Sequence, residues 1–476
     1  MSAASFPQAV EAPVATPTPV EDRQTAIALL RQRFGDRLST STGVRDHHGK
    51  DESWHPPHRP DAVVFPQSTE EVAEIVRICA AYRTPVIAYG TGTSLEGNVI
   101  PHLGGVVVDL AHMNQVLRLS VEDLDVTVQA RVTRKELNAH VRDQGLFFPL
   151  DPGADASIGG MAATRASGTN AVRYGTMREN VLGLTVVLAD GRTIRTSRRA
   201  RKSAAGYDLT RLFVGSEGTL GIIAEVTVRL VGIPEATAAA VCAFDTIEGA
   251  VNTVIQTIQL GVPVARIELL DDVQMGSLNK YSKMHHAVKN TLFIEFHGTD
   301  AGVKEQARVV QGVAAENGGG EFKWATRPEE RNALWTARHD VTWANKALRP
   351  GCEIWASDVC VPISRLAECI TESKRDLAQS FLTAPLVGHV GDGNFHLGFL
   401  VMRDDPKELA EAERLNDRLV MRALAMDGTC TGEHGVGLGK QKFLVAEHGE
   451  AVGVMRQIKQ ALDPLNILNP GKIFAL

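Results

Sequence analysis

The spacing of apolar positions over residues 60–231 predicts a mixed α/β domain. Apolar residues three and four positions apart indicate a helix over residues 69–82, where Ser68 and Glu71 have the spacing of a capping box, and another over residues 133–144. Short runs rich in β-branched residues, bounded by turn residues, predict strands. These strands cover residues 85–89, 105–110, 125–131, 181–188 and 221–230. Because strands and helices do not alternate strictly, we predict the α+β class.

The pattern changes near Pro234, where longer helical periods begin and indicate a second α+β domain. Its predicted strands cover residues 240–244, 291–297 and 386–389, and its predicted helices residues 331–348, 409–426 and 451–462. We therefore divide the chain into an extension too poor in core-forming residues to fold, a helical segment, two domains and a C-terminal segment. These parts are residues 1–20, 21–57, 58–233, 234–427 and 428–476.

Composition and charge exclude several classes of protein. With 476 residues, 44% hydrophobic and 22% charged, the chain resembles ordinary globular proteins, and a net charge of −6 gives no basic field for nucleic acid. No apolar run reaches the roughly 20 residues of a membrane span, and residues 1–20 lack the basic start of a signal peptide. The six cysteines form no CxxC pair, which suits a reducing compartment. We expect a cytoplasmic protein, peripheral to the inner membrane at most.

Three glycine-rich loops lie within the first domain, and together they predict a shared ligand. They cover residues 90–98, directly after a predicted strand, residues 151–170 and residues 215–223. Loops of this kind expose several backbone N–H groups in a small concavity that suits phosphate. The first loop is not a Rossmann fingerprint, because Leu95 occupies the position of the third glycine. A Walker A loop is also excluded, since Gln441 follows Gly439-Lys440.

Two histidines in the second domain and a glutamate in the C-terminal segment are candidates for a metal site. If Asp392-Gly393 forms a two-residue hairpin turn, His389 lies directly opposite His396, close enough for both imidazoles to bind one ion. Glu433 is a candidate third ligand, and His/His/Glu with open positions is typical of catalytic sites. Zn, Mn and Fe all suit this donor set. The alternative is that these histidines only hydrogen-bond backbone near glycine-rich turns.

The glycine loops, in their order and spacing, resemble the FAD-binding domain of the vanillyl-alcohol oxidase/p-cresol methylhydroxylase flavoproteins, as do residues 174–178 and 187–191. The resemblance implies a two-subdomain FAD-binding domain, an α+β substrate-binding cap domain and a C-terminal helical segment that returns to the flavin. It implies non-covalent FAD, because no His or Cys lies within residues 90–98. The implied cofactor contacts are Tyr89, Gly90, Thr91, Gly92, Thr93, Ser94, Gly97, Asn98, Asp151, Gly153, Ser157, Gly159, Gly160, Ala163, Ser167, Gly168, Asn170, Tyr174, Gly175, Glu217, Gly218, Gly221, Ile222, Ile223 and Asn469.

The histidine motifs, together with residues 334–339, 349–364 and 468–472, closely resemble the cytochrome-type D-lactate dehydrogenase family. Glycolate oxidase catalytic subunits and D-2-hydroxyglutarate dehydrogenases are nearby relatives. The resemblance covers residues 58–472. It implies that a D-2-hydroxy acid such as D-lactate is oxidised to a 2-oxo acid while FAD accepts a hydride at N5. It also implies reoxidation by cytochrome c, a quinone or an electron-transfer protein; a homodimer is a further expectation.

Each chemical task in this oxidation has a candidate residue. Arg338 offers a bidentate fork for the substrate carboxylate, with a helix-surface salt bridge as its alternative, and Thr342, one helical turn on, assists it. A metal on His389, His396 and Glu433 lowers the pKa of the substrate hydroxyl, so that His434 acts as base. Asn394 contacts the substrate.

Substrate choice and two other classes of function remain open at this point. By a register made by eye, Glu353 occupies the place of a lysine that binds the second carboxylate in dicarboxylate-oxidising relatives, which favours D-lactate over D-2-hydroxyglutarate. A non-catalytic flavin-carrying subunit would not need this set of histidines, Arg338 and Glu433. A metal-dependent hydrolase would have the metal but no flavin colour.

Overall fold

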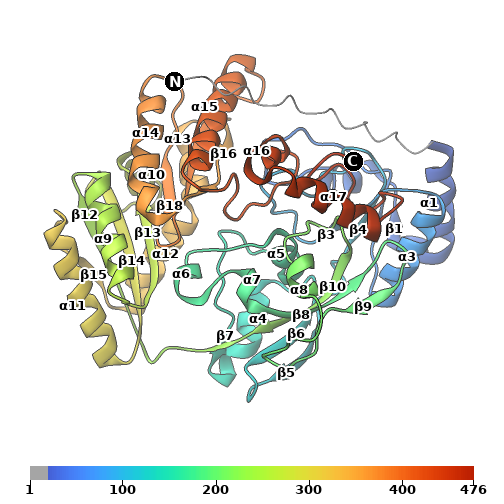
Figure 1. Cartoon of the computed structure of the whole chain (residues 1–476), viewed down its shortest axis with the longest axis horizontal. Coiled ribbons are helices and arrows are strands. Elements are labelled where there is room, and N and C mark those ends of the chain that lie inside the picture. The colour runs from blue at the N-terminus through green and yellow to red at the C-terminus, as the bar shows by residue number, and fades with distance from the viewer. Residues whose placement is uncertain (1–19) are drawn as a thin grey trace.

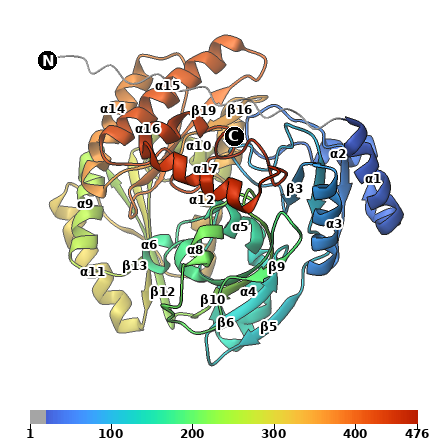
Figure 2. The same cartoon turned by 45° about the vertical axis from the view of Figure 1, so that its right-hand side comes forward.

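The computed structural model describes residues 20–476 as two domains side by side, with the C-terminal segment lying across their junction (Figure 1). The view turned by 45° shows the same arrangement, with the C-terminal helices in red above the first domain (Figure 2). The predicted disordered extension lies outside the described residues except for Val20, which begins the first helix. None of the helices described between residues 20 and 476 combines the length and apolar composition that a bilayer crossing requires.

One half of the first domain is a four-stranded sheet in the order β1–β2–β4–β3, in which only β1 is antiparallel to its neighbour. The helix between β2 and β3 buries its predicted apolar face against this sheet. Ser68 caps that helix, but the Glu71 carboxylate binds Arg37 and the Gln67 N–H, so the predicted capping box is incomplete. The elements are α1 (Val20–Phe34), η1 (Gly35–Arg37), β1 (Leu38–Ser39), α2 (Thr42–His47), β2 (Ala62–Val64), α3 (Thr69–Ala81), β3 (Val86–Tyr89) and β4 (Val106–Asp109).

The other half is a five-stranded antiparallel sheet in the order β5–β6–β10–β8–β9. Its apolar residues form a second core with the short helices that follow the glycine loops. The elements are β5 (Val116–Ser120), β6 (Asp125–Gln129), α4 (Arg134–Val141), η2 (Arg142–Gln144), β7 (Leu146–Phe147), α5 (Ile158–Thr164), α6 (Ala171–Tyr174), α7 (Met177–Asn180), β8 (Val181–Val187), β9 (Thr193–Arg195), α8 (Leu209–Phe213), β10 (Ile222–Arg229) and β11 (Val231–Gly232).

The second domain is an antiparallel sheet in the order β15–β12–β14–β13–β18–β19–β16, with β17 paired to β19. Helices α9, α11, α14 and α15 pack on one face, and α10, α12 and α13 pack on the other. The strands are β12 (Ala236–Phe244), β13 (Val264–Leu270), β14 (Asn290–Gly298), β15 (Lys323–Ala325), β16 (Glu353–Ala356), β17 (Val359–Cys360), β18 (Leu386–His389) and β19 (Asn394–Val401). The helices are α9 (Ile247–Gln259), α10 (Asp272–Ser282), α11 (Asp300–Glu316), α12 (Pro328–His339), α13 (Val341–Leu348), η3 (Ile363–Arg365), α14 (Leu366–Ala378) and α15 (Pro406–Ala425).

The C-terminal segment leaves the second domain and ends on the first. After η4 (Gln441–Phe443), α16 (Leu444–His448) and α17 (Ala451–Leu462), the chain runs beside β3. There the Val86 N–H donates to the Ile467 carbonyl at 2.7 Å and the Asn469 N–H donates to the Val86 carbonyl at 2.8 Å. The chain therefore closes on the strand that leads into the first glycine loop.

The predicted helix over residues 331–348 is wrong in one respect, because it is two helices. It ends at His339 and restarts at Val341, with Asp340 adopting a non-helical backbone between them. Arg338 is buried in α12, whereas Thr342 is exposed on α13. The break therefore separates two residues that the sequence pattern placed on one helical face.

Candidate active site

The face of the second-domain sheet that carries α10, α12 and α13 becomes polar toward the first domain. Alternate residues of a strand point to opposite faces, so Glu268 on β13 shares this face with apolar Leu270, while Ile267 and Leu269 enter the larger core. His389 on β18 and His396 on β19 lie on this face as well. The alternation of side chains along these strands therefore brings the ionisable groups of Glu268, His389 and His396 together.

The predicted register of the histidine hairpin is wrong. His389 pairs with Asn394, and His396 pairs with Val387, because a four-residue turn replaces the predicted two-residue turn. A shift of two residues keeps both histidines on one face as diagonal neighbours, since side chains alternate with a period of two. Their ring centroids lie 5.6 Å apart. The two imidazoles therefore still approach each other.

The Glu433 carboxylate lies between the two imidazoles. Its Oε1 is 3.0 Å from Nε2 of His389 and 3.2 Å from Nε2 of His396. The other nitrogens are also held, because Nδ1 of His389 lies 2.8 Å from Glu268 and Nδ1 of His396 lies 3.0 Å from the Ser357 carbonyl. Each ring thus turns Nε2 to one point and fixes Nδ1 behind it, which is how proteins orient histidines that bind metal. The three donors suit a divalent cation.

Glu268 is a buried acid that the sequence analysis missed. One of its oxygens accepts from Nε and Nη2 of Arg338, at 2.9 and 2.6 Å, and the other contacts His389. The Arg338 guanidinium is itself buried and forms an ion pair with buried Glu268, so the alternative of a helix-surface salt bridge is wrong. Two of the five N–H donors of Arg338 bind Glu268, which leaves three that can bind another group.

Asp358, also missed, anchors the loop that carries Glu433 and His434. Its Oδ2 accepts from the backbone N–H groups of both residues, at 2.9 and 2.8 Å, and from the Thr431 hydroxyl at 2.8 Å. Its Oδ1 accepts from Nδ2 of Asn394, whose second amide N–H donates to the Val359 carbonyl. The Asn394 amide N–H groups are therefore both occupied, and only its oxygen is left for a substrate. Asp358 therefore fixes the backbone of the neighbouring residues Glu433 and His434.

Burial and mutual contact shift the pKa values of this cluster in opposite directions. Burial alone lowers the pKa of His389, but Glu268 and Glu433 outweigh it and hold that pKa well above its ordinary value. Burial raises the pKa of Glu433, yet the two histidines bring it well below the usual range. Asp358 and Glu96 likewise raise the pKa of His434 against the effect of burial. Without a cation, these contacts favour the protonated forms of His389 and His434 and the ionised form of Glu433.

Two of the glycine loops meet at the end of β3. A Cβ added to Gly90 would lie 2.4 Å from the Ser157 hydroxyl, and Gly159 lies equally close to the Ala130 side chain and backbone. Gly92 has a φ of +68° and packs on the Tyr89 ring, a conformation that favours glycine. The glycine backbone thus lies so close to its neighbours that side chains at these positions would collide with them, and the loops form a tight cradle. This fits the pyrophosphate of a dinucleotide.

Asn98, Glu217 and Asn469, which are predicted to contact the flavin, bind one another and the loop that follows His434. The Glu217 carboxylate accepts from Asn98, at 2.7 Å, and from the Val436 and Gly437 N–H groups. Asn469 donates to the backbone carbonyls of Asn98 and Glu217, at 2.9 and 2.7 Å. The Glu217 side chain therefore holds the loop after His434 against the first domain. The contact of Glu217 with the cofactor, which the resemblance implies, stays a prediction.

Other predicted flavin residues contact the second domain. Arg266 donates to the Asn170 side chain at 2.8 Å and pairs with Asp151 at 3.1 Å, while the Tyr174 hydroxyl lies 2.8 Å from Nδ1 of His297. The side chains of Ile222 and Ile223 are buried in the first-domain cores. The remaining predicted positions lie in the loops or at the ends of the short helices. They are Thr91, Thr93, Ser94, Gly97, Gly153, Gly160, Ala163, Ser167, Gly168, Gly175, Gly218 and Gly221.

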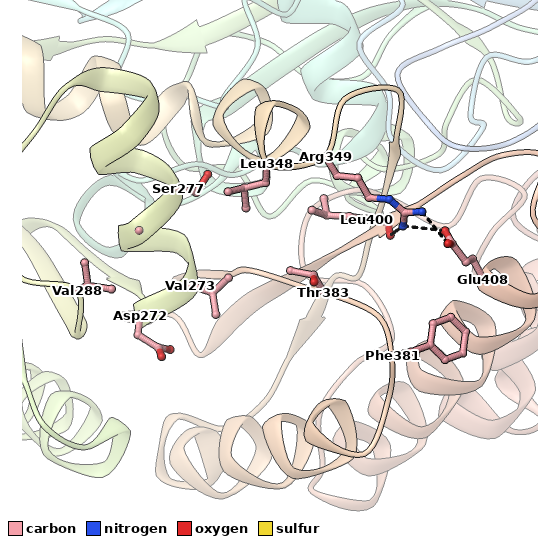
Figure 3. A pocket seen from close by; sticks show the side chains of 11 residues that line it. Asp272, Val273, Ser277, Val288, Leu348, Arg349, Phe381, Thr383, Leu400 and Glu408 are labelled. Atoms are coloured by element: carbon pink, nitrogen blue, oxygen red, sulfur yellow. Dashed lines mark hydrogen bonds and ion pairs between the residues drawn. The ribbon is translucent and has the colours of Figure 1, made fainter.

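An open pocket of about 760 Å³ in the second domain lies apart from this cluster (Figure 3). Arg349 and Glu408 pair with each other on its wall, and none of the predicted site residues lines it. Glu353 also lies elsewhere, on β16, where Lys346 and Arg403 face its carboxylate. The structure therefore removes Glu353 from the question of substrate choice.

The fold and the cradle define a flavoprotein of the p-cresol methylhydroxylase type. A solved structure of p-cresol methylhydroxylase with substrate bound superposes with a TM-score of 0.77 at 18% identity, covering 96% of this chain and 98% of that one. The model for "FAD binding domain" matches residues 60–197, and that for "FAD linked oxidases, C-terminal domain" matches residues 233–473. The predicted fold class is confirmed.

Two curated relatives narrow the family further. The chain is 53% identical to "Probable D-lactate dehydrogenase, mitochondrial" from Danio rerio, over 95% of this chain and 92% of the relative. It is 48% identical to "D-lactate dehydrogenase [cytochrome], mitochondrial" from Arabidopsis thaliana, over 94% of this chain and 79% of the relative. The chain belongs to the FAD-linked oxidases, in the cytochrome-type D-lactate dehydrogenase family, and is an FAD-dependent oxidoreductase.

The expectation of a cytoplasmic protein is wrong by this comparison, because both relatives are named as mitochondrial. The expectation came from sparse cysteines, which indicate only a reducing environment. Several compartments are reducing, so cysteine usage cannot distinguish the cytosol from the others.

Proposed function

We propose that this enzyme oxidises D-lactate, and similar D-2-hydroxy acids, to the corresponding 2-oxo acids. The observation that supports this function is the buried cluster of Arg338, His389, His396, Glu433 and His434 between the cap domain and the loops of the FAD-binding domain. The names of the relatives favour the same substrate. The cluster supplies an anion-binding group, a cation-binding group and a base within one site.

Each residue has a distinct task in this proposal. Arg338 binds the substrate carboxylate with the N–H donors that Glu268 leaves free, and Glu268 keeps the guanidinium in place. His434 accepts the proton of the substrate hydroxyl as the C2 hydrogen leaves as a hydride. FAD held non-covalently by the glycine loops would supply the hydride acceptor, and a cytochrome or a similar carrier would be its oxidant. The surrounding side chains exclude water from the reacting atoms.

We also propose a divalent cation on His389, His396 and Glu433, and the charge balance of the cluster supports it. Four carboxylates, buried at Glu96, Glu268 and Asp358 and half-buried at Glu433, face two basic side chains within the described part of the chain, Arg338 and Lys440. One divalent ion or two protonated imidazoles would neutralise the difference. An ion there would supply Lewis acidity toward the substrate hydroxyl. Zn, Mn and Fe are the candidates.

The test is anaerobic mixing of the purified flavoprotein with D-lactate, L-lactate, glycolate and D-2-hydroxyglutarate while the visible flavin band is followed. Bleaching by D-lactate in preference to the others is expected. His434→Gln should slow it by about 10²–10⁴-fold, the usual contribution of a general base, with bound flavin retained. The matched control is His140→Gln, at an exposed position of α4. Preferential bleaching by D-2-hydroxyglutarate or glycolate would reassign the substrate.

The metal is tested separately by dialysis against a chelator followed by back-titration with Zn²⁺, Mn²⁺ or Fe²⁺. The flavin should stay bound while its reduction by D-lactate is lost, and one of the ions should restore it. Because metal binding displaces protons from imidazoles, back-titration should also release protons from the chelated protein. Full activity after the ion content has fallen to zero would contradict the metal proposal.

A further inference from the structure

Three buried polar atoms without hydrogen-bond partners converge beside His434. They are Nδ1 of His434 itself, Oε1 of Glu96 and Nζ of Lys440. Glu96 Oε1 lies 3.9 Å from the histidine nitrogen and 3.5 Å from the lysine nitrogen. Glu96 is 3% exposed and Lys440 is 1% exposed, so neither group is solvated by bulk water. Buried polar groups are normally paired, and unpaired ones therefore point to a function.

Two carboxylates lie at the same distance from Nδ1 of His434, and they differ in what they already hold. Oδ2 of Asp358 is 3.9 Å away but accepts three hydrogen bonds, from Thr431 and from the backbone of Glu433 and His434. Oε1 of Glu96 is also 3.9 Å away and accepts none. Glu96 is therefore the carboxylate with capacity to receive a proton donor from this ring. Catalytic hydrogen bonds are often long in free enzymes and tighten in the complex.

We infer that Glu96, held by Lys440, positions His434 by accepting a hydrogen bond from its Nδ1–H. This contact fixes the tautomer in which Nε2 has the free lone pair and acts as the base. The Lys440 amine lies 3.5 Å from Oε1 of Glu96, the same oxygen, and holds the Glu96 carboxylate in place. Glu96 is thus a positioning residue for the proposed reaction, on which this inference rests.

The contact between Glu96 and His434 also joins two loops that lie far apart in the sequence. Glu96 lies in the loop of residues 90–98 that forms the dinucleotide cradle, whereas His434 and Lys440 lie in the loop that returns from the cap domain. The Leu438 N–H donates to the Glu96 carbonyl at 2.7 Å, so backbone contact also joins the two loops. The base is therefore positioned by the same loop that forms the cofactor cradle.

The first experiment reads the tautomer directly, by ¹⁵N NMR of the FAD-loaded protein labelled in its histidines. The His434 signals are assigned by their loss in His434→Gln. The neutral ring of the wild-type protein should carry its proton on Nδ1, and Glu96→Gln should shift the population toward the Nε2–H form. A wild-type ring with its proton on Nε2, or an identical ratio in both proteins, would overturn the inference. The wild-type result decides even if the variant does not fold.

The second experiment separates positioning from a structural role by the kinetics of flavin reduction. In Glu96→Gln, the rate constant at saturating D-lactate should fall by about 10–100-fold, the usual cost of losing an orienting partner, with flavin content and half-saturating concentration unchanged. Glu225→Gln is the matched control, because Glu225 is a partly buried carboxylate on β10 that binds only the Thr69 and Thr185 hydroxyls. An unchanged rate constant, or a parallel loss of flavin, would contradict the positioning role.

The two readouts also separate this inference from the proposed function. If D-lactate does not bleach the wild-type flavin, the proposed substrate is wrong, and the tautomer measurement still decides the role of Glu96. If D-lactate bleaches the wild-type flavin and Glu96→Gln behaves as wild type in both experiments, only the Glu96 inference fails.

Discussion

The cap-side cluster and the cofactor cradle meet at one junction, but they are built in opposite ways. In the cluster, Glu268, Arg338, His389 and Glu433 bind one another at 2.6–3.0 Å. In the cradle, the glycines let the chain approach the Ser157 side chain at Gly90 and Ala130 at Gly159, and buried polar atoms such as Oε1 of Glu96 stay unpaired beside it. The cap-side cluster is thus stabilised by ion pairs among its own side chains, whereas the cofactor cradle depends on glycines that have no side chain.

This difference predicts different failures on mutation. Removing one charge from the cluster leaves a buried partner uncompensated, which costs stability and geometry together. A methyl group added in the cradle leaves the charges of the cap-side cluster unchanged but occupies space that the ligand needs. The following changes test that contrast, beginning with the largest expected effect.

Glu268→Gln should be the most damaging single change, because it removes the charge that both Arg338 and His389 face. Breaking a buried ion pair from one side costs about 3–5 kcal/mol, and we expect a loss of that order in the free energy of unfolding of the holoenzyme in urea. The half-saturating concentration of D-lactate should rise as well, since Arg338 loses the group that holds it.

The matched control is Glu305→Gln on α11. Glu305 also binds an arginine through both oxygens, Arg308 at 2.7 and 3.2 Å, but both side chains are exposed. An exposed pair contributes about 0–1 kcal/mol, so this variant should be nearly as stable as wild type. Equal losses in the two variants would show that the Glu268 pair is no more important than a surface contact.

Glu268 also shows why part of the site escaped the sequence. Its signal was an acid in the mostly apolar run Val264–Leu270, where Arg266 is the other charged residue, but a single acid in a strand does not indicate its partner. Its partners lie 70 and 121 residues away, and only the packing of β13 between β14 and β18 brings them together. Asp358 and Glu96 were missed for the same reason. Residues within a local motif, such as His389 and His396, could be recognised together, although their register could not.

The fold was more accessible, because periodicity is a local property. The predicted strand over residues 386–389 and the predicted helix over residues 451–462 match the structure to the residue, and α3 differs by one residue. The break at Asp340 was not predictable from periodicity, since apolar residues continue through it in helical spacing. The pairing of Ile467 and Asn469 with Val86 joins residues almost 400 positions apart, which no local pattern encodes.

Gly90→Ala tests the cradle. A Cβ would lie 2.4 Å from the Ser157 hydroxyl, so either this hydroxyl, which caps α5 by accepting from the Gly160 N–H, or the loop must move. Overpacking of this kind costs about 1–3 kcal/mol, and we expect it as a roughly 5–150-fold weaker affinity for FAD in the apoprotein, measured by flavin fluorescence. Gly312→Ala on α11 is the control, because a Cβ there meets no atom within 4 Å. Unchanged flavin affinity in Gly90→Ala would contradict the assigned cradle.

The last prediction concerns the pH dependence of stability and Lys472, a buried amine behind the cradle. Burial lowers the pKa of Lys472 to about 7, despite the nearby carboxylates of Glu217 and Asp51, and its Nζ donates to the Ile100 carbonyl at 2.6 Å. Between pH 7 and the ordinary lysine pKa, the unfolded chain holds a proton that the folded chain has released. Stability therefore rises with pH across this window, by up to about 1.4 kcal/mol per pH unit, and the cost of burying the charge is fully present below it.

Lys472→Met isolates this contribution, because all other titrating groups stay in both proteins. The stability of the apoprotein relative to the variant should increase from pH 7 to pH 9 and be flat below pH 6, as followed by urea unfolding at each pH. The opposite slope would mean that Lys472 is held as a cation by Glu217 and Asp51. In that case the cradle would, like the cap-side cluster, be maintained by ion pairs, and the contrast between the two regions would fail at this point.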